Sequence, residues 1–299
     1  MTLSNQYLSA VISTHGAEVT SLRSKHHEYI WQADPTFWGR HAPLLFPIVG
    51  KVYNGTYRVD GHKYELPQHG FARDSEFELV SQGADYAELR LQHNAKTLTS
   101  YPYPFVLTIR YQLYGNQLLT DWQLFNPSNK PIFFQIGAHP AFNLPQFDPS
   151  SPTHGYLEYY YLTDDEDLDA PFTHITINRI TPDGYVLPEQ LSVDLPDGQQ
   201  PITESLFKDG ALIIEQQRVY SVVILDQHKQ PVVEMSWEDA DIPVLGIWRP
   251  YGAPFCCIEP WYGRADSLGF AGDISQRQYI QCLQPNQTFR HRHTIICRR

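Results

Sequence analysis

Ionisable side chains stand in five segments that are otherwise rich in glycine, proline and apolar residues. A charge in such surroundings is costly unless it is paired or hydrogen-bonded, so each segment is a candidate part of a functional site. Any one of these residues alone more often has a structural role, but together they predict a convergent polar pocket. The segments are WGRHAPLLFPIVG with Arg40 and His41, LPQHGFARDSEFEL with His69 and Arg73, GAHPAFN with His139, CIEPWYG with Glu259, and the weaker LFKDGALII with Asp209.

A buried carboxylate combined with imidazoles favours general acid/base chemistry. The apolar neighbours Ile258, Pro260 and Trp261 are expected to raise the pKa of Glu259, which would make it a better base for a hydroxyl proton. The sequence contains no G-x-S-x-G, G-x-x-x-x-G-K-[ST], G-x-G-x-x-G or H-E-x-x-H motif. We therefore predict acid/base catalysis with no cofactor and no metal site, and the histidine clusters 26–27 and 291–293 are weak metal candidates.

The elements that must position these residues are predicted to be strands. Turn signals recur roughly every ten residues, which is typical of an all-β sandwich or barrel. No linker rich in glycine or serine divides the chain, so we expect one domain over residues 1–299. Hairpins are predicted at 56–66 around Asp60-Gly61, at 76–93, and at 105–126 around Gly115-Asn116; further strands are expected in 7–24, 211–226, 231–239, 244–250 and 289–299, with one helical turn at the start of 205–213.

The composition excludes several classes of partner. The formal net charge of -11 would repel nucleic acid and anionic membranes. Part of that charge lies in Asp164–Asp169, which we interpret as a solvated loop. No signal peptide or long apolar run is visible, and the four cysteines lack zinc-site spacing, so a reduced, cytoplasmic protein is expected. Aromatic residues make up 13% of the chain and suit both a β core and the flat faces of sugars.

Three motifs, LPQHGFARDSEFEL, GAHPAFN and GAPFCCIEPWYG, resemble those of the aldose 1-epimerase family, the galactose mutarotases. The order and long spacings of the motifs also fit, and the resemblance extends from GAEVTSLRS to the final strand. It is closest to the shorter, LacX-like bacterial branch. The resemblance implies an all-β fold, a β-supersandwich of large twisted antiparallel sheets packed face to face, with the sugar in a groove on a concave sheet.

The family's residue roles carry over by motif. His139 resembles the general acid that protonates the sugar ring oxygen, and Glu259 resembles the general base for the anomeric hydroxyl. His69 resembles the histidine that binds and orients the sugar. Asp209 is similar to an aspartate that hydrogen-bonds sugar hydroxyls, although its flanking residues match less well. The implied activity is an isomerase reaction, the interconversion of the α and β anomers of a hexose.

The arginines leave open whether the sugar substrate carries a phosphate. Arg40 and Arg73 resemble arginines that hold phosphate in the hexose-6-phosphate branch, and Lys51 could join them in a clamp. The galactose-type branch also places an arginine in its pocket. Trp248 and Trp261 are candidates to stack on the sugar. The expected partner is therefore a small-molecule sugar, an aldohexose or its phosphate, bound by a monomer or homodimer. The alternatives are a hexose-6-phosphate 1-epimerase and a non-catalytic carbohydrate-binding or sensing protein.

Overall fold

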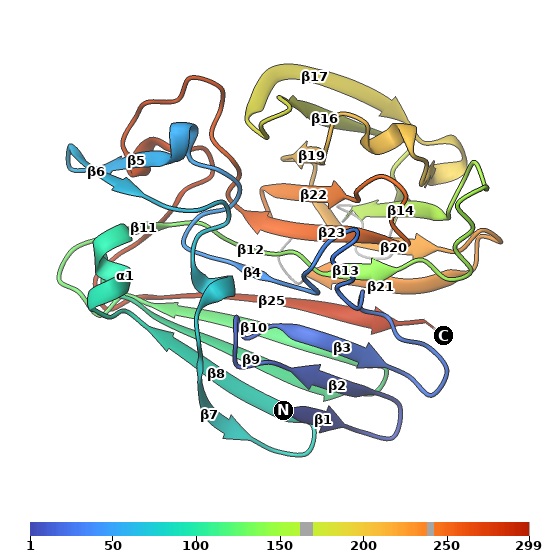
Figure 1. Ribbon diagram of the computed structural model, residues 1–299, viewed down its shortest axis with the longest axis horizontal. Coiled ribbons are helices and arrows are strands. Elements are labelled where there is room, and N and C mark those ends of the chain that lie inside the picture. The colour runs from blue at the N-terminus through green and yellow to red at the C-terminus, as the bar shows by residue number, and fades with distance from the viewer. Residues whose placement is uncertain (162–169, 238–241, 299) are drawn as a thin grey trace.

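The computed structural model describes residues 1–161, 170–237 and 242–298, and it consists almost entirely of antiparallel strands (Figure 1). The strands form two large sheets, whose apolar residues share one core. Leu107, Trp122 and Ile295 of the first sheet belong to the same buried cluster as Ile247 and Ile258 of the second. Face-to-face packing of this kind confirms the predicted all-β sandwich. The acidic run Asp164–Asp169 lies outside the described residues.

The larger sheet contains ten strands and includes two of the predicted hairpins. From one edge to the other the strands are β15 (Ala170–Pro171), β14 (Tyr156–Tyr161), β20 (Val219–Leu225), β21 (Pro231–Trp237), β25 (Thr288–Cys297), β10 (Gln117–Phe125), β9 (Val106–Tyr114), β8 (Tyr86–Gln92) and β7 (Glu78–Gln82), and β18 (Gln199–Pro201) also pairs with β14.

The second sheet contains eight strands and positions Glu259, His139 and Trp248. Its strands follow the order β17 (Val186–Asp194), β16 (His174–Ile180), β19 (Leu212–Glu215), β22 (Val244–Trp248), β23 (Phe255–Tyr262), β12 (Ile136–Ala138) and β4 (Leu44–Leu45), and β13 (Ala141–Asn143) pairs with β23 beyond the end of β12. In Figure 1 the long strands β16 and β17 lie at the top of the molecule, above β22 and β23.

Smaller elements complete the described structure. They are the sheet β1 (Thr2–Ser4), β2 (Ser9–Ile12) and β3 (Val19–Arg23), the pairs β5 (Thr56–Val59) with β6 (His62–Glu65) and β11 (Ile132–Phe134) with β24 (Gln281–Leu283), the helix α1 (Ala95–Ser100), and the 3₁₀ turns η1 (Tyr53–Gly55), η2 (Ala72–Asp74), η3 (Pro196–Gly198), η4 (Ser205–Phe207) and η5 (Ile274–Gln276). No described helix is long and apolar enough to cross a membrane.

The three predicted hairpins are present, and the turn residues of two of them suit the required backbone. Asp60 and Gly61 have φ values of 49° and 82°, which fit a two-residue turn between β5 and β6. Gly115 has a φ of 57° between β9 and β10. The predicted helical turn is confirmed as η4. Sequence reasoning did not anticipate α1, which begins with a capping box in which Asn94 and Thr97 bond each other's backbone.

Strand β23 presents side chains to both faces of the second sheet. Its alternate residues Cys256, Ile258 and Tyr262 belong to the main core between the sheets. Cys257, Glu259 and Trp261 point to the opposite face, because successive side chains of a strand alternate. All eight residues of β23 are buried, so the opposite face must also be covered. The candidate site lies there.

The histidines of the last strand, weak metal candidates from the sequence, share one face, and it is the core face. His291 and His293 are buried, with ring centroids 5.7 Å apart, and both flank Trp122. Burial lowers the pKa of His293 to about 3. Burial and the neighbouring His293 lower the pKa of His291, while Asp121 opposes that shift. Both rings are therefore neutral in the folded protein, with the hydroxyl of Tyr262 3.2 Å from Nδ1 of His291.

Candidate active site

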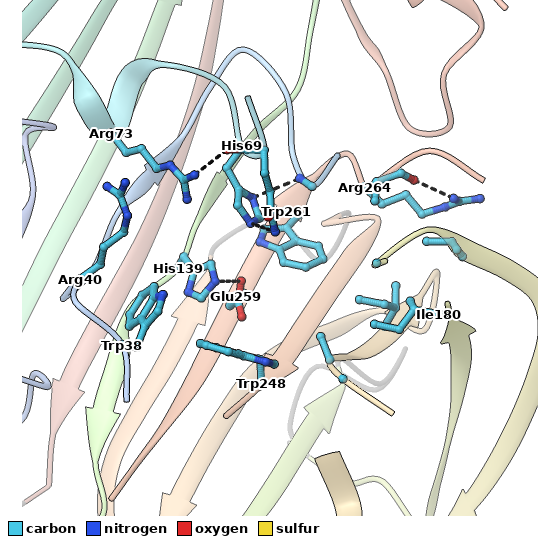
Figure 2. A pocket seen from close by; sticks show the side chains of 18 residues that line it. Trp38, Arg40, His69, Arg73, His139, Ile180, Trp248, Glu259, Trp261 and Arg264 are labelled. Atoms are coloured by element: carbon cyan, nitrogen blue, oxygen red, sulfur yellow. Dashed lines mark hydrogen bonds and ion pairs between the residues drawn. The ribbon is translucent and has the colours of Figure 1, made fainter. Parts of the chain in front are cut away.

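A cavity of about 470 Å³ opens on the side of β23 that carries Glu259. Figure 2 shows Arg40, Arg73 and Trp38 at one end of it, and Arg264 and Ile180 at the other, with His139, Glu259 and Trp248 between them. Six of the seven predicted site residues line this cavity, although they come from distant parts of the chain: Arg40, His69, Arg73, His139, Trp248 and Glu259.

The register of three adjacent strands brings His139 and Glu259 together. β12 and β13 both pair with β23 and are separated by His139 and Pro140. Gly137 lies opposite Trp261 and Ala141 opposite Cys257, and this unchanged register places His139 directly opposite Glu259. Directly opposite side chains in antiparallel strands share a face and lie close together.

The strand on the other side of β23 leaves Glu259 accessible from the cavity. Its partner in β22 is Gly246, which has no side chain to cover the carboxylate. The two acid/base candidates thus meet on one side, and on the other side the indole of Trp261 lies over Gly246. A ligand in the cavity can reach both groups.

Nε2 of His139 lies 3.0 Å from Oε2 of Glu259 (Figure 2). The two atoms are not aligned as a hydrogen bond, so Oε2 has no hydrogen-bond partner within the described residues, and neither has Nδ1 of His139. Buried polar atoms without partners are rare in folded proteins. Their presence beside a cavity indicates a site that a polar ligand completes.

Burial governs the protonation of this pair. It raises the pKa of the Glu259 carboxyl well above its usual range. It also lowers the pKa of His139 to about 3, and the positive charges of Arg73 and Arg40 contribute to that lowering. Both pKa shifts disfavour a charge on either residue. The two residues share one titratable proton, which burial alone places on Glu259 and not on His139. The short contact lets the two groups exchange that proton.

Two tryptophans hold the ring of His139. Trp38 stacks on it with ring centroids 4.8 Å apart and planes inclined by 24°. Trp248 meets it edge-on at 5.7 Å and lies 5.6 Å from Trp38. Trp248 was a predicted site residue, whereas Trp38 was not. The two indoles restrict His139 and supply flat apolar faces to the cavity.

His69 occupies a backbone conformation that few residues adopt. Its φ is 66° and that of Gly70 is 72°. A Cβ on Gly70 would meet the carbonyl oxygen of Phe46 at 2.3 Å, which explains the glycine in the HGFAR segment. Nδ1 of His69 accepts a hydrogen bond from the backbone N–H of Gly50 at 3.1 Å. Burial lowers the pKa of His69, so the ring is neutral and carries its proton on Nε2. This nitrogen lies beside His139 and 3.2 Å from the side-chain amide nitrogen of Gln68, a group that cannot accept the proton.

Trp261 lies across two neighbouring strands because both have glycine beneath it. A Cβ on Gly137 would come within 2.4 Å of Cδ1 of the indole, and one on Gly246 within 2.6 Å of Cη2. The ring lines the cavity, and its Nε1 is buried without a hydrogen-bond partner in the described structure. Trp261 therefore offers the cavity both a flat face and a polar atom.

The arginines at one end of the cavity share one carboxylate. Nη2 of Arg40 lies 2.9 Å from Oδ1 of Asp74, and Nε of Arg73 lies 3.7 Å from Oδ2 of the same residue. Nη2 of Arg73 also donates to the backbone oxygen of Gln68. Burial lowers the pKa of Arg73, and the charge of Arg40 adds to the lowering. Two cations and one anion leave this end of the cavity positively charged.

The remaining predicted residues lie further from the centre. Asp209 is exposed and does not line the cavity, although Gly210 does. Lys51 and His41 are also outside the lining, and His41 lies beside Glu18, with 3.8 Å between Nδ1 and Oε2. Asp209 thus has the least structural support among the predicted site residues.

Sequence reasoning missed Arg264, which lies at the opposite end of the cavity from Arg40. Its Nε is 3.0 Å from Oε1 of Glu215, whose other oxygen accepts a hydrogen bond from the hydroxyl of Tyr279. The signal was available, because Arg264 directly follows CIEPWYG and stands beside glycine like the other candidates. The apolar part of the lining near Arg264, which includes Ile180 and Val186, carried no such signal.

Comparison with known proteins shows the family of the chain. Residues 1–184 match the family model described as "Aldose 1-epimerase". Over 310 aligned positions the chain is 30% identical to the chromosomal protein LacX of Lactococcus lactis subsp. lactis, covering 98% of this chain and 97% of that protein.

Solved structures extend the likeness to three dimensions. A galactose mutarotase related enzyme from Lactobacillus acidophilus superimposes with a TM-score of 0.87 at 31% identity, covering 99% of this chain and 96% of the other. A galactose mutarotase-like protein from Lactobacillus casei gives a TM-score of 0.86 at 28% identity, with 99% of each chain covered. The predicted β-supersandwich of galactose mutarotase-like type is confirmed.

Proposed function

The chain belongs to the aldose 1-epimerase family, and on this basis we propose that it interconverts the α and β anomers of a hexose by acid/base-catalysed opening and closure of the sugar ring. The observation that carries the proposal is the 3.0 Å contact between His139 and Glu259 on the wall of the cavity. Mutarotation removes a proton from the C1 hydroxyl and delivers one to the ring oxygen. An acid and a base in contact can do both.

Ring opening begins with Glu259 ionised and His139 protonated. Glu259 takes the proton of the C1 hydroxyl while His139 gives its proton to the ring oxygen. The bond between C1 and the ring oxygen breaks, and an aldehyde forms at C1. Rotation about the C1–C2 bond exposes the other face of the aldehyde. On closure His139 recovers the proton from the C5 hydroxyl and Glu259 returns its proton to the C1 oxygen, so the protons balance.

Burial favours the protonation state that the pair has after the sugar ring has opened. With the proton on Glu259 and His139 neutral, the pair matches the open-chain sugar. The ionised pair matches the closed ring. Because only the position of one proton distinguishes the two states, the pair can serve opening and closure without exchanging protons with solvent.

Several cavity residues fit the binding of a sugar. The Nε2 proton of His69 can donate to a sugar hydroxyl beside His139. Trp38, Trp248 and Trp261 present flat surfaces to the C–H groups of a pyranose ring. Asp209 remains a proposed contact to a sugar hydroxyl, reached from the turn before Gly210.

A hexose 6-phosphate is a second candidate substrate, favoured by the arginine end of the cavity. Nε of Arg73 is buried with no hydrogen-bond partner among the described residues, so an anion there would satisfy it. Arg40 and Arg73 together exceed the charge of Asp74. A phosphate would pair with both guanidinium groups.

The test is a polarimetric panel with α-glucose, α-galactose and their 6-phosphates, each measured against the spontaneous rate. Acceleration of the free hexoses supports the proposed function. A preference for the 6-phosphates that Arg73→Gln abolishes supports the second candidate. Calorimetric binding of a sugar without acceleration of any of them would instead indicate a carbohydrate-binding or sensing protein, and would overturn the proposed function.

A further inference from the structure

Cys257 brings a thiol to the acid/base pair. Its Sγ, a ring nitrogen of His139 and a carboxylate oxygen of Glu259 all lie within 4.8 Å of one another, and all three residues are buried. Over residues 1–161, 170–237 and 242–298 this is the one group of three such side chains positioned to hold a metal ion. The proposed mechanism assigns the thiol no role.

The sheet explains why the three side chains converge. Cys257 and Glu259 are two residues apart in β23 and therefore share a face. Each has one small partner, since Ala141 lies opposite Cys257 and Gly246 opposite Glu259. On the remaining sides, Trp248 lies opposite Cys257 and His139 lies opposite Glu259.

The donor set identifies the kind of ion. Thiolate sulfur, imidazole nitrogen and carboxylate oxygen are the ligands that Zn²⁺ takes, whereas Mg²⁺ and Ca²⁺ prefer oxygen alone. With zinc–ligand bonds of about 2.0–2.3 Å, neighbouring ligand atoms of a tetrahedral site lie roughly 3.3–3.8 Å apart. The three ligand atoms would therefore have to approach one another by up to about 1 Å to hold the ion. One thiolate and one carboxylate would also balance the charge of Zn²⁺ in a buried site.

We propose that Cys257, His139 and Glu259 form a reversible inhibitory site for Zn²⁺ or a similarly thiophilic divalent ion. The ion enters through the cavity, which His139 and Glu259 line, and three protein ligands leave a fourth position for a water or a sugar hydroxyl. Bound metal occupies the lone pairs on which Glu259 and His139 would carry the transferred protons, so it stops catalysis. The inhibition rests on the proposed function, whereas the binding does not.

Cys256 provides a matched control for the binding test. It is the next residue in β23, is equally buried, and points into the main core on the opposite face. The exposed Cys282 is replaced by serine in every variant, because it could bind zinc on its own. Zinc binding is then measured by competition with a chromophoric chelator in this background, and in Cys257→Ser, Cys257→Ala and Cys256→Ser made upon it.

We expect one zinc ion per chain in the background protein and in Cys256→Ser. Loss of the thiolate in either Cys257 variant should weaken binding by at least about 10–100-fold, the range for removing even an outer partner of a ligand. Co²⁺ should give a thiolate charge-transfer absorption that disappears with Cys257 alone. Equal zinc affinity in a folded Cys257 variant, or no stoichiometric zinc in the background protein, overturns the proposal.

Polarimetry tests the inhibition separately. Zinc should suppress mutarotation by the background protein and by Cys256→Ser, EDTA should restore it, and saturating sugar should raise the zinc concentration required. Whatever activity Cys257→Ser retains should resist zinc. Stoichiometric zinc with undiminished mutarotation overturns the inhibitory role. Zinc binding that depends on Cys257 in a protein without mutarotase activity supports the metal site and refutes the proposed function.

Discussion

Replacing Glu259 with glutamine should remove the base while leaving the packing of the cavity nearly intact. The side chain is only 2% exposed, and the amide has almost the same size as the carboxyl. Burial already favours the uncharged form of Glu259, so a neutral amide is a close mimic of it. We therefore expect the free energy of unfolding to change by no more than about 1 kcal/mol, in the range of mild substitutions.

The effect on turnover should be much larger. A positioned acid or base typically contributes ~10²–10⁴-fold to the rate. That loss corresponds to about 2.7–5.4 kcal/mol of transition-state stabilisation, several times the expected change in stability. The rate is measured as the polarimetric decay of an α-aldose at several protein concentrations, with the spontaneous rate subtracted. Urea unfolding of the same samples confirms that the variant is folded.

A double variant sharpens this test. Because His139 and Glu259 handle one proton between them, loss of either should disable the pair, and the effects of residues that act as a unit are not additive. Glu259→Gln combined with His139→Gln should therefore be no slower than the slower single variant. A double variant whose loss equals the product of the two single losses would refute the shared proton. Wild-type turnover in a folded Glu259→Gln protein would remove Glu259 from the mechanism.

Three further outcomes are expected. Trp248→Ala should raise KM by ~3–10-fold, the worth of one aromatic contact, and a fall in kcat alone would contradict a role in binding. The pKa of His293 is about 3 in the folded protein and near 6.5 in the unfolded chain. Its contribution to the unfolding free energy should therefore be fully present above pH 6.5 and be lost as the pH falls towards 3. His293→Gln should weaken this pH dependence, as measured by urea unfolding at a series of pH values. Gly246→Ala should cost about 1–3 kcal/mol in urea unfolding because its Cβ meets Trp261, whereas Gly39→Ala, with its nearest atom at 4.0 Å, should change little.

Much of the local structure could be predicted because turn chemistry is local. The Asp60-Gly61 and Gly115-Asn116 pairs require only their own backbone angles, and both hairpins formed as expected. The choice of sheet could not be predicted in the same way. β19 and β20 follow one another in the sequence, yet they belong to different sheets, because pairing depends on distant strands.

The candidate site could likewise be predicted only in part. His139 and Glu259 could be found from sequence because each is an ionisable residue in a motif of apolar and small residues. Their direct opposition could not, since it depends on a register shared by β12, β13 and β23. The neutralisation of Arg40 by Asp74 required folding to bring the two together. The alternation of β23 also decided that Cys257, and not Cys256, lies beside Glu259.

The continuous register between β13, β12 and β23 has a consequence for refolding. It joins segments more than a hundred residues apart, and such distant pairing is slow to form because a long loop must close first. Hairpins such as β9–β10 need no such closure and are expected to form earlier. Regain of mutarotation after dilution from urea should therefore lag behind regain of strand signal in circular dichroism. Under the proposed function, the return of mutarotation would report when β12 and β13 have paired with β23.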